Sequence, residues 1–122
     1  MTKTINILGT GYKVRLSVPY RKDPDLEGKF GYTSFSGKLI VVADVRTIPG
    51  WESASEDEAL DMFLSTIRHE IIHAYLYESG LNGSSNSAES WARNEEMVDW
   101  FAIQFPKILE TFEKLQCERR LK

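Results

Sequence analysis

Hydrophobic and polar residues alternate along the first third of the chain. The apolar run Thr4–Leu8 precedes a glycine-containing turn, and Tyr12–Val18 then places every second side chain on one apolar face. This period of two predicts half-buried strands joined in a hairpin. Lys29–Phe35 and Lys38–Asp44 flank a Ser-Gly pair and predict a second hairpin. We therefore expect the strands to lie within about residues 4–44.

The segment Leu39–Ala43 is rich in β-branched residues, which favour strands. As an exposed edge strand it would offer its backbone to an extended peptide. As an interior strand it would be paired on both sides and closed to such a ligand. The sequence leaves these two placements open.

The period changes to that of a helix in the second half of the chain. Ser55 and Glu58 have the form of a capping box, after which apolar residues recur at steps of three and four. Gly80 supplies a left-handed stop. The pattern predicts a helix over about 56–79.

A second helix is predicted over about 88–105 from an apolar stripe on one face. The stripe comprises Trp91, Val98, Ala102 and Phe105. Pro106 lacks a backbone donor and should kink or end this helix, and a third helix is predicted over about 107–120. Strands first and helices afterwards are typical of an α+β fold. We expect one domain over 1–122, with a small antiparallel sheet of two hairpins packed on the first two helices.

Composition and charge argue against several classes of function. The net charge of −3 gives no electrostatic basis for binding nucleic acid, so no nucleic-acid partner is expected. No apolar run approaches the length of a membrane span or forms a signal peptide, so no membrane association is expected. Cys117 is the only cysteine and cannot form an internal disulfide, which favours a reducing cytoplasm.

The residues that carry chemistry are His69-Glu70-Ile71-Ile72-His73, an H-E-x-x-H motif in the middle of the first predicted helix. Residues four apart lie on one helix face, about 6 Å apart along the axis, so two imidazoles can bind one zinc ion. Glu70 stands next to the first histidine, where it can take a proton from water. The chain has no other histidine, and the alternative is a pair of solvated or hydrogen-bonded helix histidines.

A catalytic zinc site usually takes a third protein ligand and leaves one position open. Because no histidine remains, we expect a carboxylate of the second helix. Glu95 lies on the apolar stripe, where a carboxylate is costly unless it is paired or metal-bound. Glu96, about 100° further round the helix, is the next candidate. Asp99, one turn after Glu95, could orient a ligating histidine by accepting its second N–H.

The motif, followed by Asn94-Glu95-Glu96-Met97-Val98-Asp99, resembles the gluzincin metallopeptidases typified by thermolysin, whose pattern is H-E-x-x-H and then N-E-x-x-x-D. The resemblance implies the following roles: His69, His73 and Glu95 as Zn²⁺ ligands, Glu70 as general base, and Asp99 as the residue that orients a ligand. The second helix also looks like that of ImmA/IrrE-type metallopeptidases and of small phage and prophage proteins. The resemblance covers about Leu60–Pro106.

The expected function is zinc-dependent hydrolysis of peptide bonds in a specific protein or peptide substrate, since so small a domain has little room for a deep cleft. The alternative is a non-catalytic, zinc-bound regulatory or protein-interaction module of a phage or mobile element, located in the host cytoplasm if phage-encoded. Glu70 favours catalysis, because a structural zinc site needs no base. A similar ligand set can also hold iron. The oligomeric state stays open.

Overall fold

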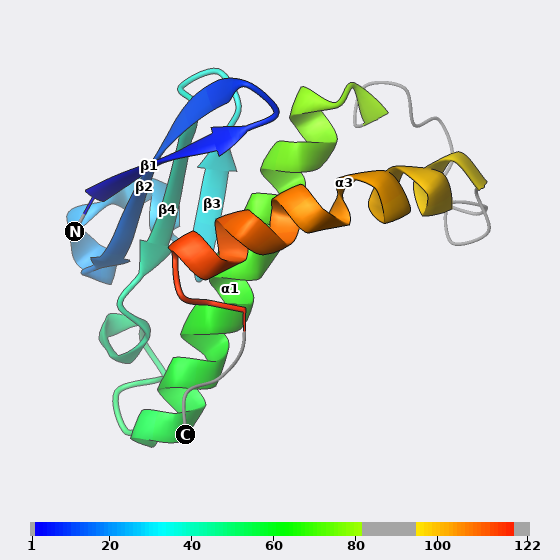
Figure 1. Cartoon of the computed structure of the whole chain (residues 1–122). Coiled ribbons are helices and arrows are strands. Elements are labelled where there is room, and N and C mark those ends of the chain that lie inside the picture. The colour runs from blue at the N-terminus through cyan, green and yellow to red at the C-terminus, as the bar shows by residue number, and fades with distance from the viewer. Residues whose placement is uncertain (1, 82–94, 119–122) are drawn as a thin grey trace.

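The computed structural model describes residues 2–81 and 95–118, with the backbone alone at residues 95, 96, 98, 99 and 102 (Figure 1). The fold is α+β, as the sequence predicted, and consists of a four-stranded mixed sheet packed against two helices. The strands are β1 (Thr2–Ile7), β2 (Thr10–Val18), β3 (Gly31–Ser34) and β4 (Leu39–Ala43). The helices are α1 (Glu56–Glu78) and α3 (Glu95–Lys114), and the short 3-10 turns are η1 (Tyr20–Lys22), η2 (Pro24–Leu26) and η3 (Val45–Thr47).

The sheet contains both predicted hairpins, in the order β1-β2-β4-β3. β1 pairs antiparallel with β2, and β3 pairs antiparallel with β4. The two hairpins join through a parallel pairing of β2 with β4, so the sheet is mixed and the expectation of a wholly antiparallel sheet was wrong. After β2 the chain passes through η1 and η2 to the far edge, and β4 then returns to the middle.

β4 is an interior strand, which settles the placement that the sequence left open. Ile40 and Val42 are fully buried in the core shared with the helices, while Val41 and Ala43 are fully buried in a second cluster on the opposite face. Leu26 of η2 is the centre of that second cluster. The edge strand beside α1 is therefore β3, and β4 has no free edge to offer a peptide.

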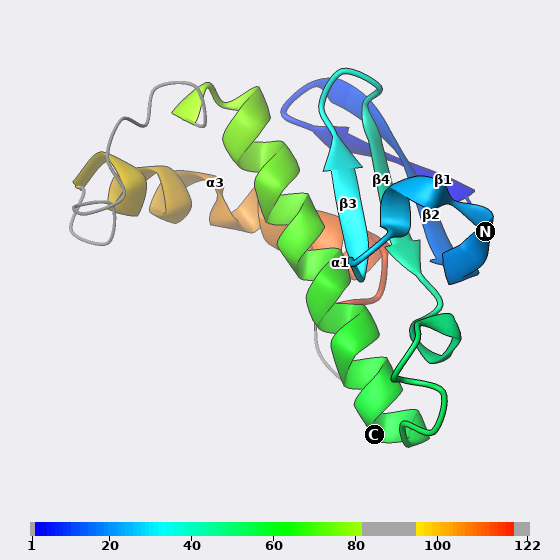
Figure 2. The ribbon, with the colours of Figure 1, turned by 180° about the vertical axis from the view of Figure 1, so that it is seen from behind.

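α1 follows the predicted boundaries closely. The Ser55 hydroxyl accepts from the Glu58 amide at 3.1 Å, and the Glu58 carboxylate accepts from the Ser55 amide at 3.2 Å. Gly80, with a φ of +87°, lies two residues beyond the last helical residue. In Figures 1 and 2, α1 runs along the β3 side of the sheet, and α3 crosses α1.

α3 continues through Pro106, which the sequence predicted as a kink or an end. The separate helix expected over 107–120 is the second half of α3 and ends at Lys114, while the predicted start near residue 88 lies outside the described residues. A proline inside a helix costs about 3 kcal/mol. Packing on both sides outweighs that cost, because Trp100 lies against the core before the proline and Ile108 is buried after it.

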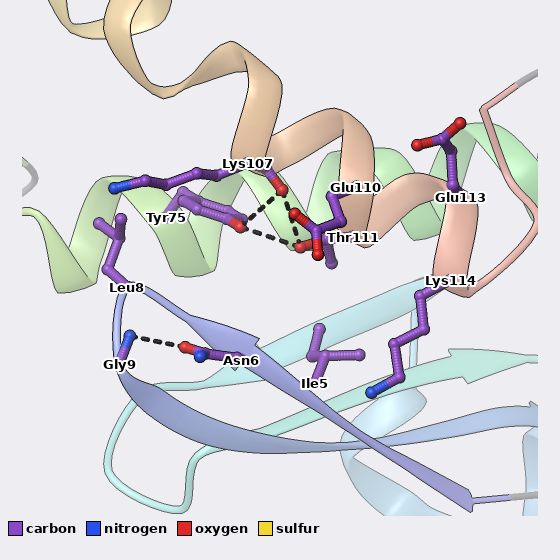
Figure 3. Close-up of a pocket in the computed structure, with 10 residues that line it drawn as sticks. All are labelled: Ile5, Asn6, Leu8, Gly9, Tyr75, Lys107, Glu110, Thr111, Glu113 and Lys114. Atoms are coloured by element: carbon purple, nitrogen blue, oxygen red, sulfur yellow. Dashed lines mark hydrogen bonds between the residues drawn. The ribbon is translucent and has the colours of Figure 1, made fainter.

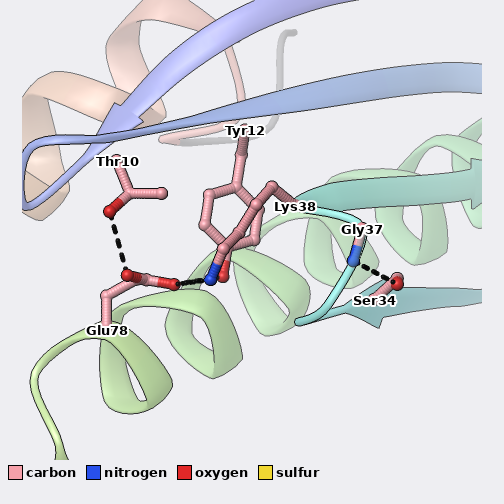
Figure 4. Close-up of polar contacts among 6 residues, drawn as sticks. All are labelled: Thr10, Tyr12, Ser34, Gly37, Lys38 and Glu78. Atoms are coloured by element: carbon pink, nitrogen blue, oxygen red, sulfur yellow. Dashed lines mark hydrogen bonds and ion pairs between the residues drawn. The ribbon is translucent and has the colours of Figure 1, made fainter.

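The last turn of α1 is tied to both hairpins by Glu78 (Figure 4). Its carboxylate accepts hydrogen bonds from Thr10 Oγ1 at 2.9 Å and Tyr12 OH at 2.7 Å, and pairs with Lys38 Nζ at 2.8 Å. Lys38 and these hydroxyls lower the pKa of the Glu78 carboxyl, while burial raises the pKa of Tyr12. The contacts fix the position of α1 relative to the sheet. Neither of the helices, as far as they are described, has an apolar window that could cross a bilayer.

Candidate metal centre

The two histidines of the motif lie close together on the exposed side of α1. Their Nε2 atoms are 3.0 Å apart, and the ring centroids are 4.6 Å apart with the planes at 77°. Positions four apart on a helix are neighbours on its surface, which explains why the rings meet. Both side chains are exposed, so the nitrogens are accessible to a ligand from solvent.

The separation of the two nitrogens fits a shared zinc ion. A tetrahedral Zn²⁺ with nitrogen ligands at about 2.05 Å holds two of them about 3.3 Å apart, close to the distance in the structure. Imidazole nitrogens are also the ligands that zinc prefers in catalytic sites. Without metal, one Nε2–H donating to the other ring accounts equally for the contact. The distance between the two nitrogens is thus compatible with a shared zinc ion.

Glu70 lies one residue from His69 but points to the protein interior, with 7% of its surface exposed. The hydroxyl of Thr33 on β3 lies 2.7 Å from Glu70 Oε1 and 3.2 Å from the Glu70 carbonyl oxygen. Sequence reasoning did not assign Thr33 to the site. The available signal was a polar, β-branched side chain on the helix-facing side of a strand, but its partner on α1 could not be deduced from local pattern.

Two hollows flank His69. One, of about 300 Å³, lies between the start of β3 and α1, and the other, of about 280 Å³, lies along α1 beside both histidines. The first is lined by Phe30, Gly31, Met62, Ser65, Thr66, His69 and Glu70. The second is lined by Ser65, Arg68, His69, Ile72, His73 and Leu76. His69 therefore stands where two side-chain-sized spaces meet.

The predicted third ligand and its neighbour are on the first turns of α3. The structure describes the helical backbone at Glu95, Glu96 and Asp99, while their side chains, and all of Asn94, lie outside the described part of the chain. Among the side chains that are described, no cluster of three potential metal ligands occurs. A third ligand from Glu95 requires the first turn of α3 to come within bonding distance of the histidine pair.

A larger cavity, of about 570 Å³, lies between β1 and α3 and includes none of the predicted site residues (Figure 3). Its buried hydroxyls bind each other, because Tyr75 OH is 2.9 Å from Thr111 Oγ1 and also donates to the Lys107 carbonyl at 3.1 Å. Burial raises the pKa of Tyr75, which keeps the phenol protonated. The two buried hydroxyls at this cavity are already satisfied by the protein, which favours a structural role for them.

Comparison of the chain with protein-family models, with curated proteins and with solved structures finds no match. The arguments about function therefore rest on the motif and on the geometry of the residues around it.

Proposed function

We propose that the chain is a zinc-dependent peptidase. His69 and His73 hold the metal, Glu95 supplies the third ligand, Asp99 orients a ligand, and Glu70 is the general base. The observation that carries the proposal is the 3.0 Å approach of the Nε2 atoms of two exposed histidines, with Glu70 lining the same hollow as His69. A structural histidine pair would need no such neighbour, whereas hydrolysis requires a base next to the metal.

When bound, Zn²⁺ would lower the pKa of a water molecule and polarise the carbonyl of the peptide bond. Glu70 takes one proton from the attacking water as the new bond between water oxygen and carbonyl carbon forms. The carbon–nitrogen bond then breaks, and Glu70 delivers the proton to the departing amine. The products are a carboxylic acid, which then loses its proton to solvent, and an amine, and Glu70 returns to its ionised state.

The arrangement favours an extended protein segment as substrate. β3 is the edge strand next to α1, and its free side can pair with an added strand through backbone hydrogen bonds. The sequence allowed β4 to pair with an extended substrate, but β4 is an interior strand, so we assign this pairing to β3. The hollow of about 300 Å³ beside Phe30 and His69 can receive one substrate side chain. We place the activity in the cytoplasm, since Cys117 is the only cysteine.

The experiment compares the zinc-loaded wild type with Glu70→Gln on a mixture of internally quenched peptides. Because the substitution keeps the size of the side chain but removes the base, we expect zinc to be retained and hydrolysis to fall by about 100-fold or more. Equal activity in both proteins would contradict the role of Glu70. Zinc binding without hydrolysis in either protein would favour the non-catalytic regulatory or interaction module. Absence of zinc from the wild type would leave a metal-free scaffold.

A further inference from the structure

β3 and α1 lie side by side (Figure 2). Successive contacts between them occur at matching intervals along the strand and along one turn of the helix. A Cβ built at Gly31 would lie 2.9 Å from Thr66 Cγ2, and two residues later Thr33 meets Glu70. Two residues of a strand rise about 6.7 Å, while four residues of a helix rise about 6 Å. The two contacts therefore repeat with nearly the same spacing, and the register of β3 along α1 decides which residue faces Glu70.

The pairing of β3 with β4 fixes the direction in which Thr33 points. Thr33 is opposite Ile40, and Ile40 is fully buried in the core shared with the helices. Residues opposite each other in a sheet project from the same face, so Thr33 is directed toward α1. Because its side chain is β-branched, few rotamers are available to it. The strand thus presents a hydroxyl to Glu70 with little freedom to turn away.

The hydroxyl has one hydrogen and two acceptors on Glu70. The carboxylate oxygen Oε1, at 2.7 Å, is closer than the backbone carbonyl oxygen at 3.2 Å, so Oε1 accepts the shorter hydrogen bond. Within the described ranges, no side chain or backbone group hydrogen-bonds to the other carboxylate oxygen, Oε2. Among the described residues, one oxygen of the proposed base is therefore bonded to the sheet and the other has no protein partner.

We propose that Thr33 is the positioning residue of Glu70: by holding Oε1 it aims Oε2 at the water that attacks the substrate. The inference rests on the peptidase function proposed above. A purely structural reading is that Thr33 satisfies a buried carboxylate, which would otherwise lack a partner at a cost to stability. The two readings differ in what a loss of the hydroxyl does to turnover when the protein stays folded.

The test uses Thr33→Val, which removes the hydroxyl but keeps the shape, and Thr33→Ser, which keeps the hydroxyl. Thr111→Val is the control of the same substitution type, because the hydroxyl of Thr111 bonds to Tyr75 and Lys107, away from Glu70. The first measurement, on metal-free protein, is the ¹³C resonance of the Glu70 side-chain carboxyl. We expect it to move in Thr33→Val and to stay near the wild-type position in Thr33→Ser and Thr111→Val.

The second measurement is hydrolysis of the same quenched peptides by the zinc-loaded proteins. We expect kcat of Thr33→Val to fall about 10-fold to 100-fold with KM and zinc content unchanged, since a misplaced catalytic group costs up to about 100-fold. Thr33→Ser should recover most of kcat, and Thr111→Val should match the wild type. An unmoved carboxyl resonance, or an unchanged kcat in Thr33→Val, would overturn the role of Thr33 alone. An inactive wild type would overturn the peptidase proposal and this inference with it.

Discussion

Two regions of α1 contain polar side chains in opposite situations. At its end, Glu78 is held by three donors from both hairpins, and its side chain is 12% exposed. In its middle, His69 and His73 are exposed, and within the described ranges they hydrogen-bond only to each other. A group whose partners all come from the protein stabilises the fold, whereas paired nitrogens that face solvent are available to a ligand.

Because the two regions differ in this way, substitutions in them are expected to affect different properties of the protein. Changes around Glu78 should alter the free energy of unfolding, because they break contacts that link α1 to the sheet. Changes at the histidines should alter metal affinity while the fold persists, because exposed side chains contribute little to packing. Thr33 and Glu70 lie between these extremes, since their bond is partly buried and belongs to the proposed active site.

The largest effect is expected from His73→Ala. Loss of one of the two proposed imidazole ligands should weaken zinc binding by more than about 100-fold, because even residues that only support ligands contribute about 10-fold to 100-fold. The dissociation constant measured by isothermal titration calorimetry checks this. Ser65→Ala, an exposed position on the same helix one turn before His69, is the control and should bind zinc like the wild type. Equal affinity in His73→Ala and wild type would place the metal elsewhere.

Gly31→Ala should produce the next largest effect, a decrease in the free energy of unfolding. A Cβ at Gly31 would lie 2.7 Å from the Val41 carbonyl oxygen and 2.9 Å from Thr66 Cγ2, so β3 must move away from α1. Overpacking of this kind costs about 1–3 kcal/mol. Urea denaturation measures the loss. In the control Gly11→Ala the nearest atom, Thr4 Cγ2, is 3.9 Å away, and stability should change little.

Tyr12→Phe tests the region around Glu78 and should cost about 1–2 kcal/mol of unfolding free energy, since a buried hydroxyl loses its bond to a carboxylate. Tyr12 is fully buried, and its hydroxyl lies 2.7 Å from Glu78 Oε2. Thermal and urea denaturation give the magnitude. Zinc affinity should be unchanged in this variant. A strong loss of zinc binding at unchanged stability would contradict the separation of the two regions.

The smallest effect is the pH dependence that Glu78 contributes. Its pKa is lowered in the folded state by Lys38 and Tyr12 from an ordinary value of 4.5. The carboxylate therefore stabilises the fold above pH 4.5, and this contribution is lost as the pH falls through the lowered pKa. Urea midpoints measured between pH 7 and pH 3 should fall less in Glu78→Gln than in the wild type. If the urea midpoints of the wild type and Glu78→Gln fell in parallel with pH, Glu78 would have the same pKa in the folded and unfolded states.

Local patterns predicted much of the fold. Both hairpins and the capping box at Ser55 arise from neighbouring residues, so they were accessible from sequence. The parallel pairing of β2 with β4 was missed because it joins strands of two different hairpins, with η1, η2 and β3 between them in the chain. The interior position of β4 had a signal, since a run such as Leu39–Ala43 with no polar face suits a strand covered on both sides. The continuation of α3 through Pro106 depends on core packing, which local pattern does not show.

The candidate site was predictable to the extent that its residues share one helix. The spacing of His69 and His73 determines that their rings meet, and the structure brings the two nitrogens together. Thr33 belongs to another element, so its contact with Glu70 depends on how β3 lies along α1. Glu95 and Asp99 stay predictions, because their side chains lie outside the described part of the chain.

The most direct test is the zinc content of protein purified without chelators, measured by native mass spectrometry beside Glu95→Ala. We expect about one zinc per wild-type chain and much weaker retention in the variant, since a catalytic site usually has three protein ligands. Retention equal to the wild type would keep the metal at the histidines and move the third ligand, with Glu96 next. A wild-type protein that takes up no zinc, even when zinc is supplied in excess, would contradict the metal centre and the peptidase proposed on it.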